Sequence, residues 1–95
     1  MIINNLLLKL KERDNESILK AKNALLSLKG KIEVLLDLQV EVNIRHGESS
    51  YDIILVTKFA CMKDLDVYLV HPAHIEVAKY IGSVVDTQAA VCYEA

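Results

Sequence analysis

LQVEVNIRHGESSYDIILVTKF, residues 38–59, is the stretch that decides the fold. From Leu38 to Arg45 apolar and polar side chains alternate strictly, which predicts a strand with one buried face. His46–Ser50 has the composition of a turn. Tyr51 to Phe59 predicts a second strand, and both faces of that strand are substantially apolar. The stretch therefore predicts a β-hairpin in which the second strand is more deeply buried than the first.

An amphipathic helix is expected before this hairpin, over about residues 15–29. The run Asp14–Ser17 supplies capping side chains and early negative charge for a helix start. Gly30 is a suitable helix stop. The apolar residues follow at helical spacing, and they are Ile18, Ala21, Leu25 and Leu28.

The two ends of the chain predict strands, over about residues 2–11 and 87–93. Between the hairpin and the last strand, a short helical piece over about 63–69 leads into a helix over 72–83. We expect the second of these helices to bury a stripe formed by Ile75, Ala78 and Ile81.

The resulting order is β-α-β-β-α-β, which is typical of an α+β ferredoxin-like domain. We expect one domain over residues 1–95, with a four-stranded antiparallel sheet and its first and third strands in the centre. Helices then cover one face of the sheet only. The other face is apolar enough to favour a homodimer that packs sheet against sheet.

Composition narrows the functional classes. The 95 residues are 53% hydrophobic and carry a net charge of −2 without a basic segment, so nucleic acid is an unexpected partner. The N-terminus lacks a charged leader, and no apolar run is long enough to span a membrane. We therefore expect a cytoplasmic protein with no membrane partner. Cys61 and Cys92 are expected to be small buried side chains.

The segment Tyr68-Leu69-Val70-His71-Pro72-Ala73-His74 holds the candidate chemistry. Pro72 is suited to open a helix, and it favours His71 as the N-cap before it. His74 follows one turn later, so a phenol and a near-neutral base can meet at this junction. In the alternative interpretation His71 is only a cap, and His74 only bonds the backbone near Tyr68.

A metal site at the same junction is disfavoured. His71 and His74 are three residues apart, and Asp64 or Asp66 could add a carboxylate. Zinc generally needs three or four well-placed ligands, and the cysteines lie far away in the sequence. We expect no metal and no cofactor.

Three motifs together resemble the stress-responsive A/B barrel (Dabb) family. Leu8–Lys11 is similar to its L-F-K-F-K opening, and Ser50–Leu55 is similar to its S-Y-D-L-V-L strand. Tyr68–His74 resembles its Y-x-x-H-P-x-H signature. The resemblance implies a ferredoxin-like chain that dimerises into an α+β barrel.

One branch of the family, the plant olivetolic acid cyclases, is enzymatic and free of cofactors. The resemblance to it implies a cavity between sheet and helices in which His74 is a general base and Tyr68 orients a carbonyl. Two histidines of that branch correspond to Asn4 and Ile53 here, so the expected pocket is less polar. The residues that the resemblance implies for ligand contact are Asn4, Leu6, Leu8, Leu55, Leu69, His71 and Ile75.

Two functional hypotheses follow. In the first, a homodimer binds a small hydrophobic or carbonyl-containing molecule without turnover. In the second, a cofactor-free cyclase, isomerase or lyase uses His74 as general base and Tyr68 to orient the substrate. An enclosed cavity with His74 pointing into it favours the second, and a His74 bonded to backbone in a collapsed core favours the first.

Overall fold

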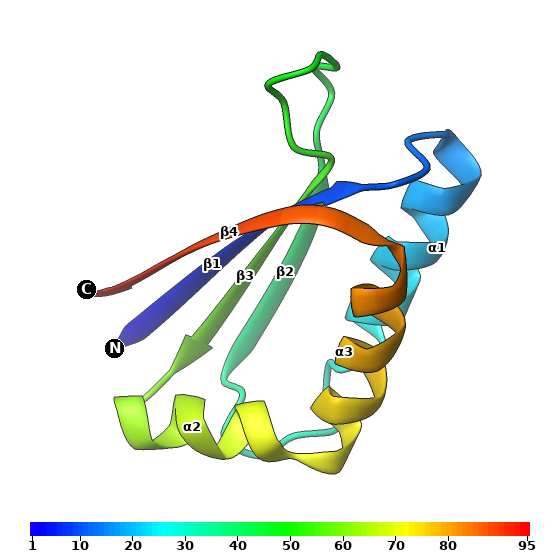
Figure 1. The fold of residues 1–95 in the computed structure, drawn as a ribbon. Helices are drawn as coiled ribbons and strands as arrows, with labels where there is room; N and C mark the ends of the chain where they lie inside the picture. Colours follow the sequence, from blue (N-terminus) through cyan, green and yellow to red (C-terminus); the bar gives the residue numbers. More distant parts are fainter.

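The computed structural model describes residues 1–95 (Figure 1). Four strands and three helices follow in the order β-α-β-β-α-α-β, with the second crossover split into two helices. None of the helices has the length and apolar character needed to cross a membrane. The elements are β1 (Ile2–Leu10), α1 (Asn15–Leu26), β2 (Asp37–Val42), β3 (Ile53–Phe59), α2 (Met62–Val70), α3 (Pro72–Val84) and β4 (Val85–Glu94).

The strands form one antiparallel sheet in the order β2-β3-β1-β4, so the first and third strands are central as predicted. In the registers of β1, Leu6 lies opposite Leu55 of β3 and opposite Ala90 of β4. The helices lie on one face of this sheet, and both termini lie at the same end of it, on the neighbouring strands β1 and β4 (Figure 1). The predicted ferredoxin-like α+β fold is confirmed.

Helix α1 begins as the sequence predicts and ends earlier. The Asp14 side chain accepts a hydrogen bond from the backbone N–H of Ser17 at 2.7 Å, which caps the helix. The helix ends at Leu26, and the next residues close tighter turns, in which Leu28 N–H bonds the carbonyl of Leu25. Gly30 then adopts a φ of 81°, which other residues rarely adopt, and this reverses the chain.

The hairpin is shorter in its strands than predicted. The side-chain oxygen of Asn43 accepts from Arg45 N–H and its amide donates to the Tyr51 carbonyl, so the chain turns out of the strand at Asn43. The expectation that Ile44 faces the core is wrong, because it lies beyond this turn and is 96% exposed. Strand β3 begins at Ile53, two residues later than expected.

The crossover bends where the sequence predicts it. His71 has an extended backbone (φ −66°, ψ 137°) that ends α2 and precedes α3. Its Nδ1 accepts a hydrogen bond from Ala73 N–H at 3.1 Å, which confirms His71 as an N-cap. Pro72 then occupies the first position of α3, where its missing N–H costs nothing.

The core lies between the sheet and the helices, and 16 apolar residues form it as one cluster. Ile81 of α3 is buried within it. The rest of the predicted α3 stripe is wrong, because Ala78 is exposed and Ile75 is 53% exposed. The face of α3 turned to the core instead carries Val77, Ile81 and Val84, and it is therefore rotated from the prediction.

The cysteines also differ from expectation. Cys61 precedes α2 and Cys92 lies on β4, and both are exposed and unpaired. Cys92 lies on an edge strand that the helices do not cover (Figure 1). The predicted burial therefore fails because β4 extends past the helical layer.

The face of the sheet away from the helices is open and largely apolar. The central strands present alternate residues to it, and none of these residues is buried. On β4, Val91 is 64% exposed. This set, named the open face below, consists of Ile3, Asn5, Leu7, Ile54, Val56, Ala89, Val91 and Tyr93.

A buried carboxylate joins β1 to the residue before β3. Asp52 is 1% exposed, and it accepts hydrogen bonds from Leu10 N–H at 2.9 Å and from Arg13 Nε at 3.0 Å. Arg13 also donates to the Ser50 carbonyl at 2.9 Å. This network anchors the base of the hairpin to the loop before α1. The alternation of residues 51–59 does not predict this network, because it places the polar Asp52 on the outward face of the strand.

We predict that Asp52→Ala lowers the free energy of unfolding by about 2–4 kcal/mol, since it leaves Leu10 N–H unpaired in the interior and removes the carboxylate partner of Arg13. Urea unfolding followed by circular dichroism measures the loss. The matched control is Asp37→Ala, whose ion pair with Lys58 is long (3.9 Å) and exposed, and it should cost less than about 1 kcal/mol. Equal losses in the two variants would contradict the structural role of Asp52.

Candidate functional site

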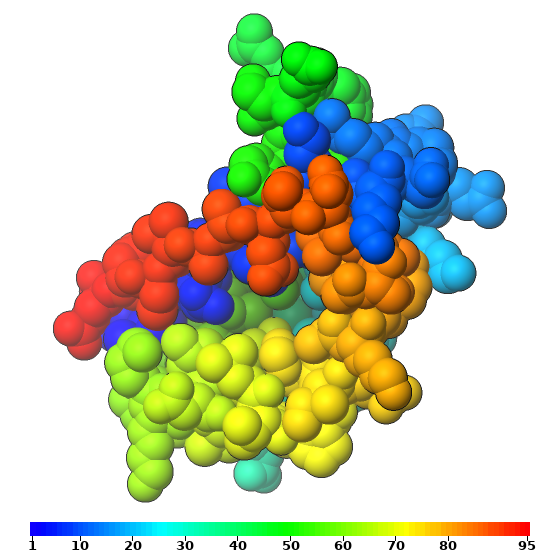
Figure 2. Space-filling model, in the orientation of Figure 1, coloured from blue at the N-terminus to red at the C-terminus, as the bar shows by residue number.

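A cavity of about 410 Å³ lies between the inner face of the sheet and helices α1, α2 and α3. Figure 2 shows the molecule hollowed between β4 and the two later helices. Eleven of the 16 lining residues are hydrophobic. The lining consists of Asn4, Leu6, Leu25, Leu28, Leu55, Thr57, Tyr68, Leu69, His74, Val77, Ala78, Ile81, Gly82, Val85, Gln88 and Ala90.

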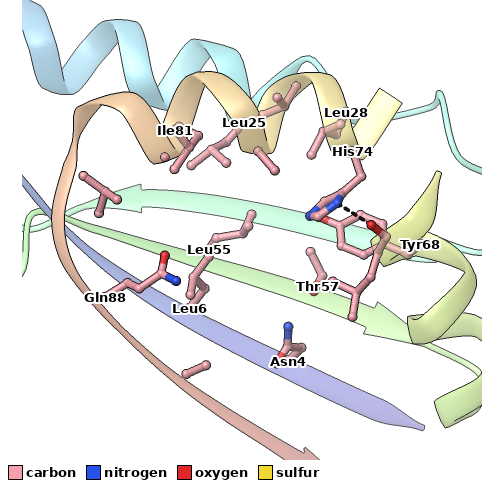
Figure 3. Close-up of a pocket in the computed structure, with 16 residues that line it drawn as sticks. Asn4, Leu6, Leu25, Leu28, Leu55, Thr57, Tyr68, His74, Ile81 and Gln88 are labelled. Carbon is pink, nitrogen blue, oxygen red and sulfur yellow. Dashed lines mark hydrogen bonds between the residues drawn. The ribbon is translucent and has the colours of Figure 1, made fainter. Parts of the chain in front are cut away.

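Tyr68 lies at one end of the cavity, near the C-terminus of α2 (Figure 3). Its ring packs on Phe59 with centroids 5.1 Å apart, which fixes its position over β3. The side chain is almost fully buried, yet no protein group hydrogen-bonds its hydroxyl, and no fully buried side-chain polar atom lacks a partner. The small remaining exposure therefore includes the hydroxyl. Burial raises the pKa of Tyr68 to about 12, so the phenol remains a hydrogen-bond donor at neutral pH.

His74 lies beside Tyr68, with ring centroids 4.5 Å apart. Its Nδ1 is 3.0 Å from the Leu69 carbonyl, and a carbonyl only accepts, so Nδ1 carries the proton of this bond. The other ring nitrogen, Nε2, then bears the lone pair and points into the cavity (Figure 3). Burial lowers the pKa of His74 from 6.5, and the Leu69 bond opposes that shift only in part. At neutral pH, Nε2 is an unprotonated base.

Two polar residues of the sheet lie near this pair. Asn4 of β1 and Thr57 of β3 are directly opposite each other in the register, on the face that the helices cover. Neither side chain has a hydrogen-bond partner in the protein, and the amide of Asn4 is directed toward the cavity (Figure 3). The cavity thus has a polar end, formed by Asn4, Thr57, Tyr68 and His74, and a remainder in which Gln88 is the one amide among mainly apolar side chains.

The structure brings together six of the nine residues named from the sequence. Tyr68, His74 and Asn4 line the cavity with Leu6, Leu55 and Leu69. The other three lie elsewhere, and the reasons are local. Leu8 is enclosed in the core, His71 is occupied as the α3 cap, and Ile75 faces outward from α3. Ile53 is 1% exposed in the core and does not line the cavity either.

Sequence reasoning missed several lining residues. Thr57 was detectable, because it is the one polar residue on the parity of Ile53, Leu55 and Phe59. Gln88 of β4 follows the same logic, since it lies opposite Leu8 in the register of the sheet. Leu25 of α1 and Leu28 just after it are spaced as ordinary core positions, and no local signal marks them as cavity wall.

No three histidine, cysteine or acidic side chains lie close enough together to hold a metal ion. The cap bond of His71 also keeps its Nδ1 directed at α3. The polar end can instead present a base at Nε2 of His74 beside a phenolic donor on Tyr68. Such a pair suits proton transfer next to a carbonyl, or simple hydrogen bonding to a bound molecule.

Comparison with known proteins identifies the family. Residues 5–95 match the Stress Responsive A/B Barrel Domain family, Dabb. The chain belongs to this family. No curated protein matches it by sequence.

Solved structures extend this comparison. A dimeric protein of unknown function and ferredoxin-like fold from Bacteroides fragilis is 28% identical, with 99% of this chain and 95% of that chain covered and a TM-score of 0.84. A dimeric ferredoxin-like protein from Thermobifida fusca is 18% identical (99% and 90% covered, TM-score 0.86). The hydroxynitrile lyase of Passiflora edulis is 10% identical (97% and 90% covered, TM-score 0.83). At such identities the last two show a shared fold alone.

We predict that His74 lowers stability in mild acid. Its pKa is lowered in the folded state, so as the pH falls below 6.5 the unfolded chain takes up a proton that the folded chain resists. The free energy of unfolding therefore falls through this range and levels off once the lowered pKa is passed. Urea unfolding between pH 8 and pH 5 measures this, with His74→Gln as the comparison. A pH dependence that is the same in the two proteins would contradict the lowered pKa.

Proposed function

We propose that this Dabb domain binds a small hydrophobic or carbonyl-containing molecule in the cavity between its sheet and helices. The observation that carries the proposal is the cavity itself. Its volume of about 410 Å³ lies within the range of small-molecule sites, and a mainly apolar wall with a few convergent polar groups is their usual lining. The Tyr68 hydroxyl has no hydrogen-bond partner in the protein and is therefore free to bind a molecule in the cavity.

We predict that para-propylphenol raises the melting temperature of the wild-type protein and that His74→Gln or Tyr68→Phe removes most of the increase. Ligand at 100 times its Kd adds about 2.7 kcal/mol to the free energy of unfolding. The matched controls are His46→Gln in the exposed hairpin and Tyr93→Phe on the open face, and both should respond as wild type does. An equal response in all five proteins would place the binding outside the cavity.

We further propose that two copies of the chain pair through the open face. That face exposes apolar side chains from three strands, and solvent contact there costs about 25 cal/mol per Å². The Bacteroides fragilis relative, 28% identical, is described as dimeric, which agrees with this arrangement. Two sheets packed face to face would bury both apolar surfaces with one two-fold contact.

We predict that the wild-type chain sediments as a dimer at micromolar concentration and that Val56→Glu shifts it to monomer. Val56 lies opposite Asn5 and Gln39 in the sheet. The glutamate side chain would therefore place a negative charge inside the contact. Val67→Glu on the outside of α2 is the control, and it should remain dimeric. A wild-type monomer, or a dimer that survives Val56→Glu, would remove this proposal.

We also propose that the protein is cytoplasmic. Both cysteines are exposed thiols, and such thiols persist in a reducing compartment. Fractionation of cells that express the protein, with detection of the chain in the soluble fraction, tests it.

A second candidate function is cofactor-free catalysis of proton transfer. The observation that favours it is the tautomer of His74, because the Leu69 bond leaves a basic nitrogen aimed into the cavity beside the Tyr68 phenol. In the proposed step Nε2 takes a proton from a carbon next to a carbonyl. The electron pair moves to the carbonyl oxygen, which accepts a hydrogen bond from Tyr68, and the proton later returns from Nε2.

We predict that the wild-type protein accelerates deuterium exchange at the methylene of phenylacetone in heavy water, followed by proton NMR. His74→Gln should lower the protein-dependent rate by about 100-fold or more, and Tyr68→Phe by about tenfold. His46→Gln is the control and should retain the full rate. If exchange with the wild type equals that in buffer, the catalytic function fails, although binding can still hold.

A further inference from the structure

The wall of the cavity carries no formal charge. Of its 16 residues none is lysine, arginine, aspartate or glutamate, and Tyr68 and His74 are the only ones that titrate. Tyr68 remains a neutral phenol at physiological pH. The His74 ring is held by its hydrogen bond from Nδ1 to the Leu69 carbonyl and has no charged partner. The site therefore contains hydrogen-bonding groups without a counter-charge for an ion.

Four of the five hydrogen-bonding side chains gather at one end of the cavity, and they are Asn4, Thr57, Tyr68 and His74 (Figure 3). Leu25, Leu55 and Ile81 line the middle, and the fifth, Gln88, lies away from that end. The cross-strand pair of Asn4 and Thr57 supplies an amide and a hydroxyl side by side, each able to donate and to accept. Tyr68 adds a donor and Nε2 of His74 an acceptor. A molecule with one polar end and an apolar body matches this division.

We infer that the cavity selects an uncharged, amphipathic molecule whose hydroxyl, amide or carbonyl head lies against Asn4, Thr57 and Tyr68, and that it excludes a carboxylate of the same shape. This inference rests on the function proposed above, which requires only that something binds. It adds the charge class of the ligand, the direction in which the ligand lies, and a role for the Asn4 and Thr57 pair.

Desolvation is the physical reason for the exclusion. A carboxylate that enters the cavity loses its hydration and meets three uncharged hydrogen-bonding side chains in return, which compensates a neutral head fully and an anion only in part. Buried carboxyl groups without a cation shift their pKa upward by several units, so the ionised form binds correspondingly more weakly. An amide of the same shape carries no such penalty.

The test compares two probes of the same shape, para-propylbenzamide with a neutral head group and para-propylbenzoate with an anionic one. Their affinities are measured at pH 8 by titration of ¹⁵N-labelled protein, with amide shifts of the cavity residues as the readout. At this pH the benzoate is ionised and His74 is neutral. We expect the benzoate to bind at least about 100-fold more weakly than the benzamide.

Three outcomes separate the two proposals. Strong preference for the benzamide supports the inference. Equal or tighter binding of the benzoate overturns the inference and leaves the binding function standing. Failure of both probes, and of propylbenzene, to shift any cavity residue overturns the binding function and the inference together.

Thr57→Val tests the placement of the head group. Valine fills the same space without the hydroxyl, and we expect the affinity for para-propylbenzamide to fall about three- to tenfold. The affinity for propylbenzene, which has no head group, should stay the same or rise. Thr87→Val on the outer face of β4, which makes the same change outside the cavity, is the matched control and should bind both probes as the wild type does. Equal changes for both probes in Thr57→Val would indicate altered packing and contradict the proposed orientation.

Discussion

The cavity depends on the break between α2 and α3 at His71 and Pro72. In one continuous helix Tyr68 and His74, six residues apart, would point about 120° away from each other. The extended backbone of His71 redirects the chain, so both rings reach the same cavity from different helices. The cap bond from Ala73 N–H to His71 stabilises the new helix start at the point where Pro72 removes a donor. One short sequence thus ends a helix, begins another and assembles the polar end of the site.

The same break explains why the interior is not filled. Helix α3 is turned so that Val77 and Ile81 meet the core while Ile75 faces solvent, and the space near Asn4 and Thr57 stays open. A domain under selection for stability alone would place an apolar side chain there, since an unfilled cavity lowers the free energy of unfolding. A binding site, in contrast, requires polar side chains such as those of Tyr68 and Thr57 to face the cavity.

Periodicity and turn chemistry account for the parts of the structure that the sequence predicts. The strand order, the Asp14 cap and the His71 cap each follow from residue types at fixed local spacing. The failures have two causes, a side chain that competes with the strand ladder and packing between helices. Ile44 continues the alternation of its strand, but the Asn43 side chain takes over the backbone bonds that would extend it. On α3 the apolar residues form two overlapping stripes, one with Ile75 and Ala78 and one with Val77 and Val84. Spacing alone does not decide which stripe faces the core.

Neighbouring residues of β1 lie on opposite faces of the sheet, one at the cavity and the next on the open face. Asn4 points into the cavity, whereas the next residue, Asn5, donates to the Val91 carbonyl of β4 at 3.2 Å and belongs to the open face. Strand β4 is shared in the same way, with Gln88 and Ala90 at the cavity and Val91 and Tyr93 outside. Because β4 is an edge strand that pairs only with β1 and also lines the cavity, its position relative to β1 sets the width of the cavity on that side. A second copy packed on the open face would hold β4 against β1, so pairing of the chains and selectivity of the cavity depend on the same two strands.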